Sequence, residues 1–234
     1  MDKTKRRLLA VLLTALPAAC ASIGDAPQGT GIVPPAGMSV VRPPAVGQQW
    51  VYQVRDMYSR QIVDEVTETV VATAPAIHIQ RVSRQHGPLS DEIQNRWGML
   101  VQDPHWNPPV AFAQPMPAWP ADLALTRPQA YSGSYRLLDT PDYSLAWNLT
   151  MAPLGWESIA VPAGEFKTLH YTNHINFQSH EFYYRIESER DESVWLAPQV
   201  GRWVLRRSQG SYYVRGRGGD GREDALQWEL ESWR

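Results

Sequence analysis

Three histidines that are close in sequence, His170, His174 and His180, are the first side chains that could bind a metal ion. They fall in an alternating stretch, and residues four apart along a strand are separated by about 13 Å. One ion with bonds of about 2 Å cannot bridge His170 and His174 over that span. The chain has a single cysteine, so no thiolate pair replaces them. We therefore predict a polar outer face here, with no metal and no other cofactor.

Paired carboxylates follow, and such pairs can act as the acid and base of glycoside hydrolysis. The candidates are Glu187, Glu189, Asp191 and Glu192. We interpret them as the solvated end of a charged strand. The stretch Gly216–Gly221 matches the dinucleotide-binding pattern GxGxxG, which requires a following helix. The thirteen residues that remain alternate like a strand, so we interpret the stretch as a hairpin loop. No GxSxG, HExxH or P-loop motif occurs, and we predict that the protein is not an enzyme.

Arginines are concentrated near the end of the chain, where Asp220 is the only acid between Arg202 and Arg222. A basic strip of this kind can contact anionic lipid headgroups or the phosphates of lipid A. It can equally be an exposed sheet edge that its charge protects from aggregation. Both interpretations stay open for this strip: Arg202, Arg206, Arg207, Arg215, Arg217 and Arg222.

The elements that must position these side chains are strands, and the segment from Trp156 to Leu205 is central to them. Apolar side chains alternate with polar ones on both sides of Gln178-Ser179. With Gln178-Ser179 as a two-residue loop, Ile175 faces Phe182 and His170 faces Glu187. Gln-Ser is a poor turn pair, so a longer loop is the open alternative.

Similar alternation predicts strands along most of the remaining chain. In the last one, Leu226, Trp228 and Leu230 are predicted to face the core, and Gln227 and Glu229 to face solvent. No window of ten or more residues shows a helical stripe, and only 121–126 suggests one helical turn. The predicted class is all-β, a mainly antiparallel sheet curled into an open barrel or a two-layer sandwich. The predicted strands are 50–54, 61–72, 76–84, 92–96, 99–102, 131–137, 143–150, 155–161, 202–209, 211–216 and 225–233.

The segment from Asp103 to Pro120 holds six prolines and two tryptophans, a composition that disfavours a central strand. We predict a long loop, of a length that is often functional. In one interpretation Trp106 and Trp119 belong to a lid or wall over an apolar groove that binds a ligand. In the other they cap the end of the barrel.

The first 19 residues resemble an export signal, with basic residues before the apolar run Leu8–Leu16. That run is too short to span a bilayer, which needs about 20 residues. Cys20 follows Pro17-Ala18-Ala19 and resembles the acylated cysteine of a bacterial lipobox, although Pro17 occupies the usual leucine position. We predict lipidation of Cys20. The alternative is ordinary cleavage near Cys20, which would release a soluble periplasmic protein.

Domain organisation follows from composition. Residues 1–19 are predicted to be the signal peptide, 20–48 a flexible tether rich in Pro and Gly, and 49–234 a single β domain. Without residues 1–19 the chain has 18 basic and 23 acidic residues, a formal net charge of −5. That charge disfavours nucleic acid as a partner.

Three motifs add a family resemblance: VGQQWVY (46–52), VPAGEFKT (161–168) and VWLAPQVGRWV (194–204). They resemble the VGxxWxY, PAGxFxT and WxAPxVG motifs of a broad group of uncharacterised bacterial envelope β-rich lipoproteins. The resemblance implies an open-barrel domain, loosely similar to lipoprotein carriers, and implies no catalytic residues.

The function predicted from these observations is a non-enzymatic binding or structural role in the bacterial cell envelope. The protein would be anchored by lipid in the outer membrane and face the periplasm. Its partner would be an apolar ligand or an envelope protein. The first alternative is a carrier of a lipid or another apolar ligand on the concave face of the sheet. An envelope hydrolase is the weakest alternative.

Overall fold

The computed structural model describes residues 27–124, 126–216 and 218–234. These residues form one 14-stranded sheet in which every pairing is antiparallel. They contain no helix, and none therefore that is long and apolar enough to cross a membrane. The strands are β1 (Thr30–Ile32), β2 (Gln49–Asp56), β3 (Ile62–Ala72), β4 (Ile77–Ser83), β5 (Gly87–Pro88), β6 (Glu92–Arg96), β7 (Met99–Asp103), β8 (Val110–Pro117), β9 (Gln129–Leu137), β10 (Leu145–Val161), β11 (Gly164–Phe177), β12 (Arg185–Ala197), β13 (Arg202–Val214) and β14 (Asp220–Trp233).

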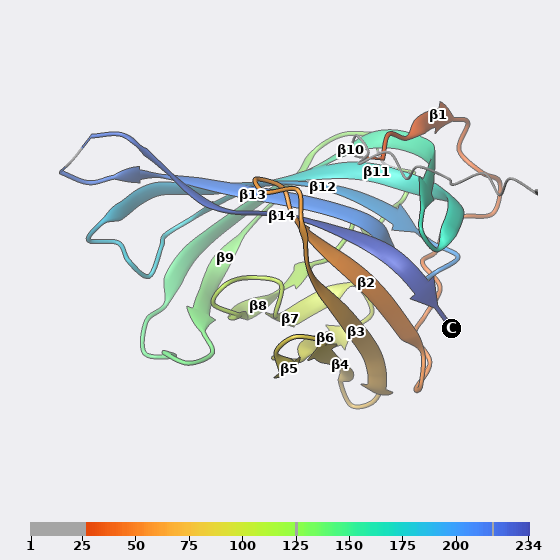
Figure 1. Ribbon diagram of the computed structural model, residues 1–234, viewed down its shortest axis with the longest axis horizontal. Coiled ribbons are helices and arrows are strands. Elements are labelled where there is room, and N and C mark those ends of the chain that lie inside the picture. Colours follow the sequence, from red (N-terminus) through yellow and green to blue (C-terminus); the bar gives the residue numbers. More distant parts are fainter. Residues whose placement is uncertain (1–26, 125, 217) are drawn as a thin grey trace, which may run out of the picture.

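The sheet closes on itself. Its order runs from β10 through β11, β12, β13, β14, β2, β3, β4, β6, β7 and β8 to β9, and β9 pairs back with the first half of β10. The long strands β10–β14 form a broad curved layer above the shorter strands β3–β8 (Figure 1). The predicted all-β class is thus confirmed, and the β9–β10 pairing makes the barrel closed.

The interior of the barrel follows from the alternation of side chains along its strands. In β2, Trp50, Tyr52 and Val54 are buried, as the sequence pattern predicts. In β14, Trp228 and Leu230 belong to the core, and Leu226 packs against it. Glu229, predicted to face solvent, is only 9% exposed and accepts a hydrogen bond from Gln227.

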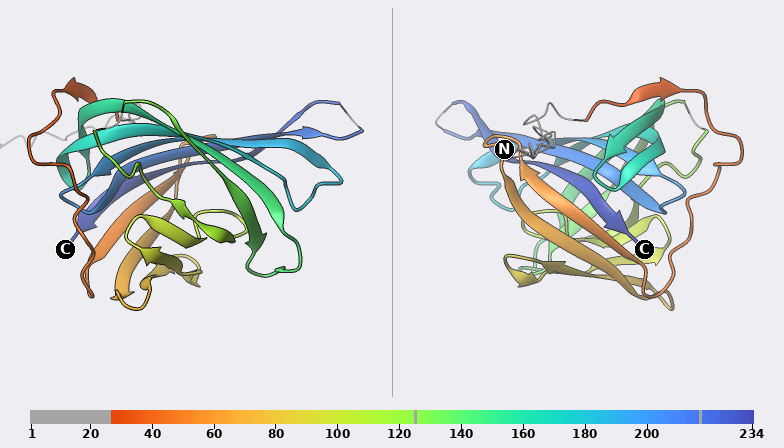
Figure 2. Two further views of the ribbon diagram at one scale, coloured as in Figure 1. Left: turned by 180° about the vertical axis from the view of Figure 1, so that it is seen from behind. Right: turned by 45° about the vertical axis from the view of Figure 1, so that its right-hand side comes forward.

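The described part of the predicted tether, residues 27–48, lies against the barrel. β1 pairs with Trp156–Ser158 on the second half of β10. Farther along, Val41 is buried, the Arg42 amide donates to the Pro198 carbonyl and the Gly47 amide to that of Val70. The segment passes along the end of the barrel where the C-terminus lies (Figure 2).

The prediction of a long loop over 103–120 is wrong for half of its length, because β8 is a strand of the barrel and Asp103 ends β7. It pairs with β7 at both ends and with β9 through Val110–Phe112. The register with β7 shifts between Leu100 and Gln102, which leaves Pro115 in an irregular stretch outside the ladder. Proline is tolerated at such bulges because no ladder hydrogen bond needs its nitrogen.

The hairpin between β11 and β12 has the longer of the two predicted loops. Residues 178–184 connect the strands, so His170 pairs with Trp195 and Ile175 with Arg190. The predicted pairs His170–Glu187 and Ile175–Phe182 are therefore wrong. Glu181, Tyr184 and Arg185 close the loop with their own backbone hydrogen bonds, which replace the tight turn that Gln-Ser disfavours.

Candidate functional site

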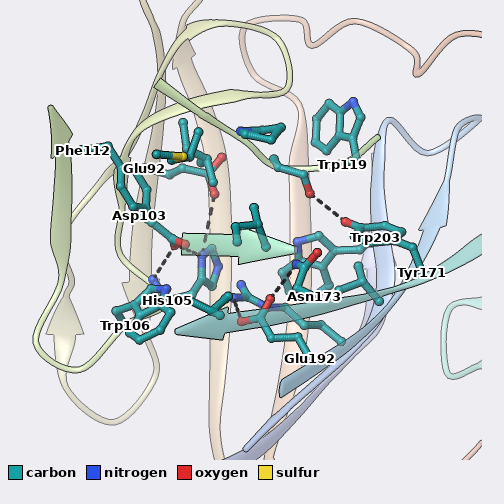
Figure 3. A pocket seen from close by; sticks show the side chains of 18 of the residues that line it. Glu92, Asp103, His105, Trp106, Phe112, Trp119, Tyr171, Asn173, Glu192 and Trp203 are labelled. Atoms are coloured by element: carbon teal, nitrogen blue, oxygen red, sulfur yellow. Dashed lines mark hydrogen bonds and ion pairs between the residues drawn. The ribbon is translucent and has the colours of Figure 1, made fainter. Parts of the chain in front are cut away.

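A small cavity lies inside the barrel and is the candidate functional site. Its volume is about 60 Å³, and both aromatic and charged side chains line it. The labelled side chains converge on it from β6–β8 and the turns on either side of β8, and from β11–β13 (Figure 3). Its lining includes Trp106, Trp119, Asp103, His105, Glu192 and Arg206.

Trp106 and Trp119 are both 7% exposed, belong to the core and line the small cavity. Trp106 packs edge-to-face against Trp147 and Phe177, with ring centroids 4.5 Å and 5.1 Å apart. Trp119 packs edge-to-face against Trp97 at 5.1 Å. Gly98 leaves the room for this, because a Cβ there would lie 2.8 Å from the Trp119 ring. The two tryptophans thus fill the barrel as fixed parts of its packing.

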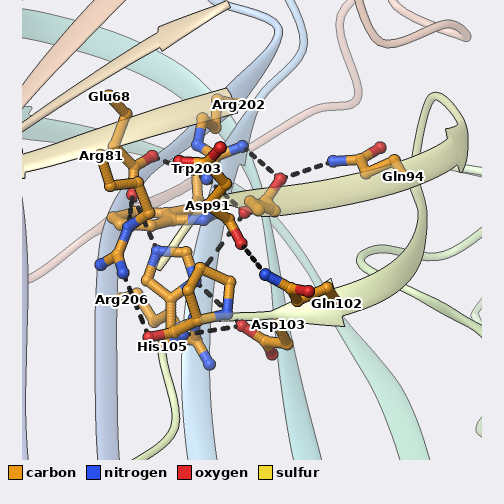
Figure 4. A network of polar contacts seen from close by, with 12 residues as sticks. Glu68, Arg81, Asp91, Gln94, Gln102, Asp103, His105, Arg202, Trp203 and Arg206 are labelled. Atoms are coloured by element: carbon orange, nitrogen blue, oxygen red, sulfur yellow. Dashed lines mark hydrogen bonds and ion pairs between the residues drawn. The ribbon is translucent and has the colours of Figure 1, made fainter. Parts of the chain in front are cut away.

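An ionic network occupies the middle of the interior (Figure 4). Arg202 of β13 makes two hydrogen bonds to the Glu92 carboxylate of β6, at 3.0 and 2.7 Å. The same guanidinium lies 2.7 Å from Glu68 Oε2 of β3. Arg81 of β4 donates to Glu68 Oε1 at 2.9 Å. These four side chains are almost completely buried and hold together strands from opposite sides of the barrel.

His105 extends the network from the turn between β7 and β8. Its Nε2 lies 2.9 Å from Glu68 Oε1, and its Nδ1 lies 3.0 Å from Asp103 Oδ1. A carboxylate oxygen can only accept, so both ring nitrogens must donate, which describes the imidazolium form. The side chain is only 3% exposed. His105 thereby supplies positive charge between two buried carboxylates.

A second ion pair lies next to this network. Arg206 of β13 donates to Glu192 of β12 at 2.6 Å, and Asn173 of β11 donates to the other oxygen of Glu192 at 3.0 Å. Asn173 Oδ1 is buried and has no hydrogen-bond partner in the described structure. A cavity needs only about 10–15 Å³ to hold one water. The space beside these polar groups therefore suits ordered water.

The protonation states follow from burial and charge. Burial raises the pKa of Glu68, but the positive charges of Arg202 and His105 outweigh it and hold that pKa below its ordinary value. Burial likewise raises the pKa of Asp103, and the hydrogen bond and charge of His105 lower it further than burial raises it. Burial lowers the pKa of Arg202, while Glu68 and Glu92 raise it above its ordinary value. Glu68, Asp103 and Arg202 are therefore ionised at neutral pH.

The predicted arginine strip does not exist as one surface. Arg202 and Arg206 point into the barrel, whereas Arg207 is half-buried outside and donates to Gln227 and to the Pro27 carbonyl. Arg215 and Arg222 are exposed, and Arg217 lies outside the described residues. The reason is the alternation of β13, which sends neighbouring side chains to opposite faces.

The predicted carboxylate group is also divided between faces. Glu187 is exposed, Glu189 accepts from Ser211 at 3.1 Å, and Asp191 contacts His174 at 2.8 Å. Only Glu192 reaches the interior. These four carboxylates are therefore not placed together in one site, as a catalytic acid and base would have to be.

The three histidines are not brought together either. His170 contacts Glu157 at 3.0 Å and stacks on Trp195 at 4.1 Å. His174 and His180 are exposed. No three His, Cys, Asp or Glu side chains among the described residues are placed to hold one metal ion. The GxGxxG stretch begins two residues after β13 ends at Val214, and its last two residues, Asp220 and Gly221, begin the antiparallel strand β14.

The sequence patterns considered above did not predict a role for four residues of the network: Glu68, Arg81, Glu92 and His105. A signal for two of them was present, because Glu68 has the same strand parity as the buried Val66 and Val70. Arg81 likewise shares the parity of Ile77 and Ile79. Charges of opposite sign on the buried parity of adjacent strands indicate an internal ion pair.

Comparisons with known proteins identify the fold. A presumed lipoprotein from Parabacteroides distasonis superimposes with a TM-score of 0.55 and 15% identity, over 84% of this chain and 99% of that one. A presumed exported protein with a YmcC-like fold from Bacteroides fragilis gives a TM-score of 0.54 and 11% identity, over the same shares of both chains. No protein-family model and no curated protein sequence matches the chain. The chain therefore shares the fold of these two proteins.

Proposed function

We propose that this chain is a lipoprotein of the bacterial cell envelope, anchored through acylated Cys20 at the outer membrane and facing the periplasm. Its role is binding or structural and not enzymatic. The order of basic, apolar and small residues before Cys20 supports export to the cell envelope. The fold that it shares with a presumed lipoprotein and a presumed exported protein agrees with it.

The observation that carries the proposed role is the filled interior. Ligand pockets usually measure about 300–1,000 Å³, whereas the interior cavity measures about 60 Å³. The charged side chains next to it are already paired with one another. A barrel packed in this way acts as a rigid scaffold, and its partners bind on the outside.

Mass spectrometry of the mature protein from envelope fractions tests this proposal. We expect an N-terminal peptide that begins at Cys20 and carries acyl chains, in the outer-membrane fraction. An unmodified N-terminus beyond Cys20 would contradict the lipid anchor. Recovery of the acylated protein in the inner membrane would contradict only its proposed location at the outer membrane.

The second candidate is a carrier of an apolar ligand, and one observation favours it. An apolar pocket of about 450 Å³ lies outside the barrel, between residues 32–39 and β10. A carrier would bind a fluorescent fatty acid with saturation in solution, without vesicles. Met38→Glu in that pocket would then weaken binding at least about tenfold, while Val71→Glu on β3 would not. Absence of saturable binding would exclude the carrier.

A further inference from the structure

The external pocket lies where the N-terminal segment crosses the second half of β10. Ile32, Pro34, Pro35 and Met38 line it from the N-terminal segment, and Trp156 and Leu169 line it from β10 and β11. Its volume of about 450 Å³ lies within the usual range of ligand pockets, about 300–1,000 Å³. None of these six side chains carries a charge, so the pocket suits hydrocarbon.

Apolar side chains at this end of the barrel are also exposed to solvent. Val33 is 85% exposed, Val40 73% and Leu154 59%. Leu154 lies between Pro153 and Gly155, where a bulge interrupts the pairing of β10 with β11. Gly155 has a φ of 139°, a conformation that other residues rarely adopt. The bulge presents Leu154 outward beside the pocket.

The start of the described chain places this surface close to the predicted anchor. The Pro27 carbonyl accepts a hydrogen bond from Arg207 at 2.9 Å, and β1 begins three residues later. Cys20 precedes Pro27 by seven residues. An extended chain spans at most about 3.3–3.6 Å per residue, so Cys20 lies within about 25 Å of Pro27. A bilayer that holds Cys20 therefore lies within reach of residues 32–40.

We propose that this end of the barrel docks on the membrane and that the external pocket takes an acyl chain of a bilayer phospholipid. The proposal rests on the proposed lipid anchor and extends it, because it assigns the domain a fixed membrane-facing surface. Exposed valine and leucine side chains gain from burial in the acyl region of a bilayer. A second copy of the chain fits less well. A stable dimer buries about 1,200 Å² or more, and a hollow, proline-walled surface offers few protruding side chains for that.

Photo-crosslinking of the mature protein in vesicles tests this docking. The vesicles contain a phospholipid with a diazirine in its acyl chain. We expect crosslinks at residues 32–40 and 153–156. Val33→Glu and Leu154→Glu are each expected to reduce crosslinking at least about fivefold, because a charge is costly in hydrocarbon. Val71→Glu, 44% exposed on β3, is the matched control and is expected to leave it unchanged.

The outcomes separate this inference from the anchor on which it rests. An acylated Cys20 without crosslinks at the pocket would overturn the docking surface and leave the anchor standing. Crosslinks at the pocket in a protein without acyl chains would support the docking surface and refute the anchor. A dimer in vesicle-free solution that Val33→Glu dissociates would show that a second copy covers this face. Saturable binding of a free fatty acid without crosslinks in vesicles would assign the pocket to a soluble ligand. Either of these last two results would overturn the docking proposal.

Discussion

At the scale of single residues, Arg202 lies at the centre of the buried ionic network. Its guanidinium contacts both Glu68 and Glu92 while it is 1% exposed. A buried ion pair adds little stability compared with an apolar pair of the same shape, because both charges lose their hydration. Removing one partner is different, since it leaves an uncompensated charge in the interior.

The first prediction therefore concerns Arg202→Met. We expect the free energy of unfolding to fall by about 3–5 kcal/mol, because Glu68 and Glu92 lose their shared cation. Denaturant titration measures the change. Arg222→Met, at an exposed position of β14, is the control and should stay within about 0.5 kcal/mol. Equal effects of the two substitutions would show that the network does not stabilise the barrel.

The second prediction concerns acid. The folded-state pKa values of Glu68 and Asp103 lie below those of the free side chains, 4.5 and 3.8. The unfolded chain therefore binds these protons first as the pH falls. The stability contributed by these groups is complete at neutral pH and is lost below about pH 4.

Asp103→Asn removes one of these two titrating carboxylates and thereby tests its contribution separately. We expect the free energy of unfolding of this variant to fall less steeply between pH 5 and pH 3 than that of the parent, since one proton-binding difference is removed. Asp142→Asn, in an exposed loop, serves as the control and should keep the parental slope. If Asp103→Asn also kept the parental slope, the ion pair with His105 would not contribute to acid sensitivity.

At the scale of elements, β14 connects the two halves of the sheet, because it pairs with β13 and β2. Trp228 lies near the rings of Tyr52 and Trp203 and under the guanidinium of Arg81. Our third prediction is that Trp228→Ala lowers the free energy of unfolding by about 3–5 kcal/mol. Ser232→Ala, exposed on the same strand, should change it by less than about 0.5 kcal/mol. A small effect of Trp228→Ala in denaturant titration would contradict the register of β14.

The alternation of apolar and polar residues was sufficient to predict most strands and the fold class, because successive side chains of a strand point to opposite faces and only one face is buried. It failed at β8, where a register shift lets Pro115 stay in a barrel strand. It also failed at the β11–β12 hairpin, whose seven-residue loop changes every pair. Local sequence does not contain the distant partner that fixes such registers.

The interior charges escaped prediction for a related reason. A pattern of apolar and polar residues assigns charged side chains to the outside. Arg202, Glu92 and Glu68 become tolerable inside only because the closed sheet brings them together from β13, β6 and β3. The pairing is long-range, 110 residues between Glu92 and Arg202, and no local motif reports it. Predicting the site requires the topology first.

At the scale of the whole molecule, the position of the barrel relative to a membrane depends on residues 27–48. As a free coil, the whole segment from Cys20 would hold its ends about 30 Å apart. As part of the barrel surface, it leaves only the few residues before Pro27 as a link. The barrel would then lie directly at the bilayer, with the same end always facing it, and would not be held away from it by a long flexible tether.

The fourth prediction decides between these two arrangements by hydrogen exchange. The amides of Arg42 and Gly47 donate to Pro198 and Val70 at 2.9 and 2.8 Å, and β1 is hydrogen-bonded to β10. We expect peptides from 30–48 to exchange more slowly than the exposed loop 139–144, because these amides must break their bonds first. Exchange at the rate of the 139–144 loop would show a free tether. In that case the pocket would lose its outer wall, and a membrane-facing surface built on residues 32–40 could not persist.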